Sequence, residues 1–182
     1  MDTIETLTQR NSDFAGHGFV AGLRIVPQLK TLLVGCLDPR VDPTQILGIE
    51  LGEVGVIRNI GGRVTPDVLA EIALLVTLTK ALGGTLGPGW DLIVLQHTDC
   101  GILRLQDPPD KLAQLFDVDP ESLGDKYVGD PRAAVEADIA TLRDSPLMPG
   151  ALRVTGMVYD VETGRIDTVV GSAVLRPDPG NV

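Results

Sequence analysis

The sequence has few of the side chains that most often carry chemistry. Its 182 residues include two cysteines, two histidines, one tryptophan, two tyrosines and three phenylalanines. With so few aromatic rings, we expect a core built mainly from Leu, Ile, Val and Ala. The positions of the cysteines and histidines therefore become the first features to explain.

Long apolar runs and an excess of positive charge are also missing. The longest apolar stretch, Ile72–Val76, is far too short for a bilayer, which needs about 20 apolar residues. Residues 1–10 are polar and acidic and lack the order of a signal peptide, so we expect a cytoplasmic protein with no membrane partner. The formal net charge of -10 argues against a nucleic-acid partner, because proteins that bind nucleic acid usually carry a basic face.

The length of the chain fits one domain with a sizeable core. Residues 1–28 are expected to form an N-terminal arm, with a helical start that is loosened by Gly16, Gly18 and Gly22. Residues 29–182 are expected to form a single α/β domain.

Short apolar runs alternate with helical patterns through this domain. The runs expected as strands are Thr31–Gly35 and Glu53–Asn59, both as buried strands, then Asp91–Gln96, Leu152–Tyr159 and Arg165–Val170. Long helices are expected from Thr65–Asp67 to Gly83–Gly84 and over Pro131–Arg143, with loop and short helices across residues 106–130. The alternation predicts an α/β fold with a mostly parallel central sheet of four to five strands flanked by helices.

Both cysteines and one histidine fall where predicted strands end. Cys36 follows the first apolar run, and His97 and Cys100 follow the third. In sheets of this kind the functional site lies beyond the carboxyl ends of the strands, so we expect the three side chains to converge. Two thiolates and an imidazole form a Cys2His site for Zn2+. Three protein ligands with an open fourth position are typical of catalytic rather than structural zinc, so residues 29–182 are expected to be a zinc-binding catalytic domain.

Asp38 and Arg40 follow Cys36 directly and are the candidate catalytic residues. The Arg40 guanidinium can clamp the Asp38 carboxylate in a bidentate pair. While Arg40 holds Asp38, the fourth zinc position is open to water. A released Asp38 can become the fourth ligand and close the site.

Simpler interpretations stay open for these residues. Cys36 and Cys100 can form a disulfide, although a reducing compartment favours metal binding or catalysis. Asp42 stands six positions after Cys36, where a phosphate-binding cysteine loop needs an arginine. His17 is expected on the surface of the arm, and Gly61–Gly62 as a plain turn before a helix.

These motifs together resemble the β-class carbonic anhydrases. Cys36–Arg40 is similar to the Cys-x-Asp-[Ser/Ala]-Arg motif of that family, and His97–Cys100 to its His-x-x-Cys motif. Arg58–Gly62 matches the family's Arg-Asn-Ala-Gly segment, and with the closing strands the resemblance covers roughly residues 30–170. Pro39 replaces the usual small residue and Ile60 replaces the usual alanine, and neither change removes a ligand.

The resemblance implies reversible hydration of CO2 to bicarbonate by a zinc-bound hydroxide. In that reaction Asp38 accepts a hydrogen bond from the hydroxide, and Arg40 orients Asp38. The compact prokaryotic branch of the family includes carbonyl sulfide hydrolases with the same ligands, so conversion of COS to hydrogen sulfide and CO2 is the alternative. A non-catalytic domain stabilised by zinc is a third interpretation. The resemblance and the arm also imply a homodimer or homotetramer.

Overall fold

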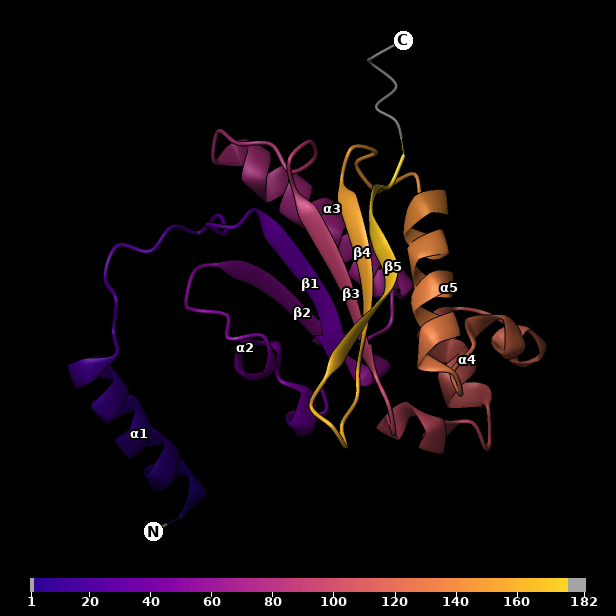
Figure 1. The fold of residues 1–182 in the computed structure, drawn as a ribbon, viewed down its shortest axis with the longest axis horizontal. Helices are drawn as coiled ribbons and strands as arrows, with labels where there is room; N and C mark the ends of the chain where they lie inside the picture. The colour runs from indigo at the N-terminus through magenta and orange to yellow at the C-terminus, as the bar shows by residue number, and fades with distance from the viewer. Residues whose placement is uncertain (1, 177–182) are drawn as a thin grey trace.

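The computed structural model describes residues 2–176, and a five-stranded sheet forms its centre (Figure 1). The strands are β1 (Thr31–Cys36), β2 (Val54–Asn59), β3 (Asp91–His97), β4 (Arg153–Tyr159) and β5 (Ile166–Val174). Their order in the sheet is β2-β1-β3-β4-β5. The first four strands run parallel and β5 pairs antiparallel with β4, which confirms the expected mostly parallel α/β sheet.

The two strands expected to be buried differ in their surroundings. β1 lies between β2 and β3, and every residue from Thr31 to Cys36 is buried. The expectation that residues 53–59 form a second buried strand is wrong in one respect. β2 is at the edge of the sheet, and all six of its residues are only half-buried. An apolar run does not by itself distinguish a central strand from an edge strand.

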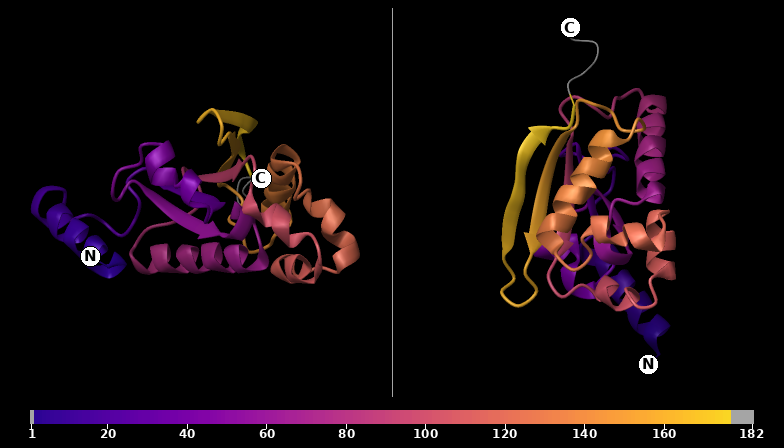
Figure 2. Two further views of the ribbon diagram at one scale, coloured as in Figure 1. Left: turned by 90° about the horizontal axis from the view of Figure 1, so that it is seen from below. Right: turned by 90° about the vertical axis from the view of Figure 1, so that its right-hand side faces the viewer.

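Two long helices cover one face of the sheet. α3 (Pro66–Ala81) and α5 (Pro131–Asp144) begin with proline, and the Thr65 and Asp130 side chains cap their free N–H groups. Inward side chains of both helices share one core cluster with the even-numbered residues of β1 and β3, which point to the same face. Figure 2 shows both helices lying along the sheet.

Short helices fill the connections near the carboxyl ends of the strands. They are η1 (Pro39–Val41), α2 (Pro43–Ile46), η2 (Ile60–Gly62), η3 (Gly101–Leu105), α4 (Asp110–Phe116) and η4 (Pro120–Lys126). The last two lie in the segment expected to be loop with short helices. A second apolar cluster joins several of these elements around Cys36 and Cys100. This end of the sheet is thus packed independently of the main core.

The helix of the N-terminal arm contributes no side chain to either core, whereas Val26, near the end of the arm, packs against the main core. α1 (Thr3–His17) is closed by a capping box between Asp2 and Glu5, and none of its residues is buried in the part of the chain that the structure describes. Figure 1 shows the helix projecting away from the sheet. His17, the last residue of the helix, is exposed. Among the described residues, the chain contains no helix with the length and apolar character needed to cross a bilayer.

Candidate metal centre

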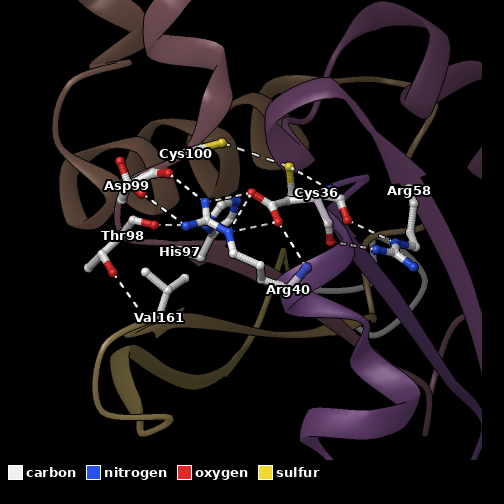
Figure 3. A network of polar contacts seen from close by, with 9 residues as sticks. Cys36, Arg40, Arg58, His97, Thr98, Asp99, Cys100 and Val161 are labelled. Atoms are coloured by element: carbon white, nitrogen blue, oxygen red, sulfur yellow. Dashed lines mark hydrogen bonds and ion pairs between the residues drawn. The ribbon is translucent and has the colours of Figure 1, made fainter.

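The parallel register brings the ends of β1 and β3 together. Thr31 pairs with Asp91, and the pairing continues to Gly35 and Leu95, so Cys36 and His97 leave the sheet side by side. The ligand atoms of Cys36, His97 and Cys100 all lie within 4.8 Å of one another, and all three residues are buried. Figure 3 shows these three side chains meeting beside Arg40. The three residues expected to bind zinc therefore form one cluster that can hold a metal ion.

His97 presents one ring nitrogen to the two cysteines. Its Nδ1 donates a hydrogen bond to the Thr98 carbonyl oxygen at 2.8 Å, which leaves the lone pair on Nε2. Within residues 2–176, the buried Nε2 has no hydrogen-bond partner. A buried acceptor without a partner is costly, and a metal ion would satisfy it. Thr98 supplies the supporting acceptor, which could not be named from the sequence.

The contact between the two cysteines shifts their pKa values in opposite directions. Cys36 and Cys100 are both free thiols with Sγ atoms 3.7 Å apart, well beyond the length of a disulfide bond. The hydrogen bond from Cys100 lowers the pKa of Cys36 to about 4, and the Asp38 N–H also donates to Cys36 Sγ at 3.4 Å. The same contact raises the pKa of Cys100. Two cysteine sulfurs, which bind zinc as thiolates, and one imidazole nitrogen form a donor set that zinc prefers.

Arg40 holds the Asp38 carboxylate next to this cluster. Its Nη2 lies 2.7 Å from Asp38 Oδ2, its Nε lies 3.1 Å from Oδ1, and its backbone N–H donates to Oδ1 at 2.9 Å. These bonds lower the pKa of Asp38 to about 2. Asp38 is 13% exposed in its side chain, so it faces the site rather than bulk solvent. The clamp that the sequence predicted is therefore present in the structure.

Arg58 of β2 fixes the segment that carries Cys36 and Asp38. Its Nε donates to the Cys36 carbonyl oxygen at 2.8 Å, and its Nη2 donates to the Asp38 carbonyl oxygen at 2.9 Å. Its Nη1 forms an ion pair with Asp42 at 2.6 Å. In the sequence Arg58 belongs to a matched motif, but no role could be predicted for it, because its partners lie outside its own strand.

Gly61 and Gly62 are more than the plain turn that was expected. Both have positive φ angles, 80° and 62°, a region that strongly favours glycine. A Cβ on Gly62 would stand 2.6 Å from the Cys36 backbone nitrogen. This turn consequently lies directly against the backbone of one candidate ligand.

A buried network of hydrogen bonds and one ion pair connects the residue before His97 to the turn after β2 and to α5. Gln96, the residue before His97, donates from Nε2 to the Gly62 carbonyl oxygen at 2.7 Å and to Asp138 Oδ2 at 3.3 Å. Asp138 in turn forms an ion pair with Arg63 at 2.8 Å. No local pattern indicates this network, since Arg63 and Asp138 are 75 positions apart.

Comparison with known proteins places this arrangement in a family. Residues 31–119 match the family model described as carbonic anhydrase. Beta-carbonic anhydrase 1 of Mycobacterium tuberculosis is 33% identical over 175 residues, which cover 93% of this chain and 99% of that protein. The chain belongs to the β-carbonic anhydrase family. The resemblance seen in the sequence motifs is thereby confirmed.

Other similar proteins show the breadth of the β-carbonic anhydrase family around this member. The crystal structure of a carbonic anhydrase from Streptococcus mutans aligns with a TM-score of 0.71 at 31% identity, covering 93% of this chain and 98% of that one. A carbon disulfide hydrolase of Acidianus is 30% identical over 189 residues, covering 90% of this chain and 87% of that protein. The fold is thus shared with a carbonic anhydrase of known structure, and the proteins similar to this chain are named after more than one reaction.

Proposed function

We propose that this protein catalyses the reversible hydration of CO2 to bicarbonate at a zinc ion held by Cys36, His97 and Cys100. The observation that carries the proposal is the cluster of three ligand atoms within 4.8 Å, with the Asp38–Arg40 pair beside it. Three protein ligands leave one tetrahedral position of zinc for a water or substrate oxygen. When bound, zinc supplies the Lewis acidity that makes water nucleophilic near neutral pH.

Asp38 orients the attacking water. With a pKa held at about 2 by Arg40, its carboxylate stays ionised at neutral pH and is too weak a base to take the proton outright. Three donors of Arg40 make four hydrogen bonds to this carboxylate, because Nε is shared between Oδ1 at 3.1 Å and Oδ2 at 3.3 Å. The shared donor leaves room for one further hydrogen bond, which the carboxylate accepts from the water that attacks the carbon of CO2. The products are bicarbonate and one proton, which is released to solvent.

Arg40 determines which of two roles Asp38 takes. As long as the guanidinium holds the carboxylate, Asp38 acts as an acceptor near the metal. If that contact breaks, Asp38 can become a fourth ligand and close the site. Asp38 therefore acts on the reacting water, and Arg40 acts through Asp38.

The second candidate reaction is hydrolysis of a sulfur-containing relative of CO2. The similarity of about 30% to carbon disulfide hydrolases favours it. With carbonyl sulfide, water attacks the same carbon and the C–S bond breaks, giving CO2 and hydrogen sulfide. Leu37 and Ile60 follow the paired residues Cys36 and Asn59 and have exposed side chains, so they are the apolar residues whose replacement would test the choice between the two substrates.

We also propose that the protein works as a homodimer or homotetramer. An isolated helix as short as α1 is marginally stable in water, yet this one exposes Ile4, Leu7 and Phe14. A groove of about 490 Å³ lies where the arm meets α3, and its lining includes Leu74 and Leu78, which are also exposed. The arm of a second copy would bury both apolar surfaces.

The two free thiols fit a reducing compartment, and we propose the cytoplasm.

The test compares three substrates on one preparation of known zinc content. Stopped-flow measurement of CO2 hydration and of hydrogen sulfide release from COS and CS2 would be made on the unchanged protein and on Asp38→Ala. We expect CO2 hydration to dominate and Asp38→Ala to keep zinc while losing roughly 10²–10⁴-fold in turnover. Faster turnover of COS or CS2 would favour the second reaction. A zinc-loaded protein that is inactive on all three substrates would leave only the non-catalytic zinc domain.

A further inference from the structure

Asp99 lies between two of the candidate ligands in an unusual backbone conformation. It stands between His97 and Cys100 with φ at 50°, in the left-handed region that aspartate tolerates better than most residues. Its side chain is 67% exposed and lies outside the metal-binding cluster. Asp99 is therefore placed on the ligand loop without being a candidate ligand.

Asp99 binds Arg40 twice. Its Oδ2 accepts from Arg40 Nη1 at 2.9 Å, and its carbonyl oxygen accepts from Nη2 at 2.9 Å. The Asp38 carboxylate accepts hydrogen bonds from Arg40 Nε and from the second N–H group of Arg40 Nη2. Because the two carboxylates use different parts of the guanidinium, both contacts exist together. Figure 3 shows the Arg40 guanidinium facing Asp99.

The contact of Arg40 with Asp38 and its contact with Asp99 constrain different parts of the site. Arg40 and Asp38 are two positions apart, so their contact alone only fixes Asp38 within its own turn. Asp99 is 59 positions from Arg40 and sits on the loop that carries His97 and Cys100. The Asp99 contacts thus tie the Arg40 guanidinium to the loop that carries His97 and Cys100.

We propose that Asp99 is a positioning residue that ties Arg40 to the ligand loop and so keeps the Asp38 carboxylate off the metal. The inference rests on the proposed zinc site but concerns the state of that site rather than its substrate. Without the Asp99 side chain, Arg40 keeps only the contact with the Asp99 carbonyl oxygen, so the Asp38–Arg40 pair is held less firmly and Asp38 occupies the fourth metal position for a larger fraction of the time.

The test measures how readily an external ligand enters the metal site. The protein is loaded with Co2+ in place of zinc, and azide is titrated while the visible absorption of the cobalt is followed. Two variants accept the left-handed conformation: Asp99→Gly removes the side chain, and Asp99→Asn removes only its charge. Asp91→Asn is the matched control, because Asp91 pairs with Arg153 at the opposite end of the same strand.

We expect the apparent dissociation constant of azide to rise about three- to tenfold in Asp99→Gly and less in Asp99→Asn, at equal cobalt content. Asp91→Asn should match the unchanged protein. In an Asp38→Ala background, Asp99→Gly should have no further effect, since the competing carboxylate is gone.

Two results would overturn the positioning role. One is an unchanged azide affinity in Asp99→Gly. The other is an equal loss in the presence and absence of Asp38, which would mean that the glycine simply disturbs the loop. A protein that shows the expected azide pattern but hydrates no CO2 would contradict the proposed reaction while supporting the role of Asp99.

Discussion

Arg63 and Asp138 form a two-point ion pair in the interior of the protein. Arg63 Nε lies 2.8 Å from Asp138 Oδ2, and Nη2 lies 3.0 Å from Oδ1. The two residues are 1% and 2% exposed, and the guanidinium also stacks 4.9 Å from the centre of the Phe116 ring. This pair joins the turn after β2 to α5 directly below the candidate metal centre.

Removing one partner of this pair should be strongly destabilising. In Asp138→Ala the Arg63 charge stays buried without compensation, so we expect the free energy of unfolding to fall by about 3–5 kcal/mol. Urea unfolding at fixed protein concentration measures it. The double variant Arg63→Met/Asp138→Leu should recover most of the loss, because it removes both buried charges. A single variant within about 0.5 kcal/mol of the unchanged protein would contradict this account.

A side chain on Gly62 should disturb the Cys36 ligand. In Gly62→Ala the new Cβ would stand 2.6 Å from the Cys36 nitrogen at a φ of 62°, so the backbone of either segment must shift. The strained φ alone costs roughly 1–2 kcal/mol. We expect a lower midpoint of thermal unfolding and weaker zinc binding in a chelator competition. Gly101→Ala is the matched control, because a Cβ there meets no atom within 4 Å, and it should change neither measurement.

Zinc content should depend on Cys36, His97 and Cys100 and should not depend on His17. The purified protein should contain about one zinc per chain, and Cys100→Ser should lose most of it, because a hydroxyl is a poor replacement for a thiolate on zinc. His97→Ala should behave in the same way. His17→Ala should keep its zinc, since His17 is exposed on the arm. Full zinc occupancy in Cys100→Ser, measured by atomic emission, would rule out this ligand set.

The ionisation of Asp38 should depend on Arg40. The pKa of Asp38 is lowered to about 2, chiefly by its hydrogen bonds with the Arg40 side chain, so Arg40→Gln should raise it toward the ordinary value of about 3.9. A depressed pKa stabilises the folded state above the unfolded value, and this contribution is lost as the pH falls through about 2. Carboxyl ¹³C NMR of the metal-free protein measures the shift. If the pKa of Asp38 is the same in the unchanged protein and in Arg40→Gln, Arg40 does not cause the lowered pKa.

Assembly should depend on the apolar groove of α3. The unchanged protein should be at least a dimer by light scattering at micromolar concentration. Leu78→Glu should shift it toward monomer, because Leu78 lines the groove and is 46% exposed in the single chain. Leu147→Glu places the same charge on another exposed leucine outside the groove and should leave the mass unchanged. A monomeric unchanged protein would contradict the proposed arm exchange.

Most of the fold and the cluster itself could be predicted because their signals are local. The existence of strand β1 follows from its uninterrupted apolar run, and the start of α3 follows from Thr65 and Pro66. Cys36 and His97 both leave the ends of strands, and parallel neighbours end at one edge of a sheet. Short-range spacing also predicted the Asp38–Arg40 contact, because two residues in one turn can meet whatever the rest of the chain does.

The sequence by itself therefore determined the strand and helix pattern, the family and the residues that can bind a metal. Tertiary structure alone decided that β2 lies at the edge of the sheet, that Asp99 anchors Arg40 and that Arg63 pairs with Asp138. The physical reason is sequence distance. Periodicity and capping act within a few residues, whereas contacts across 59 or 75 positions exist only after the sheet has brought separate segments together.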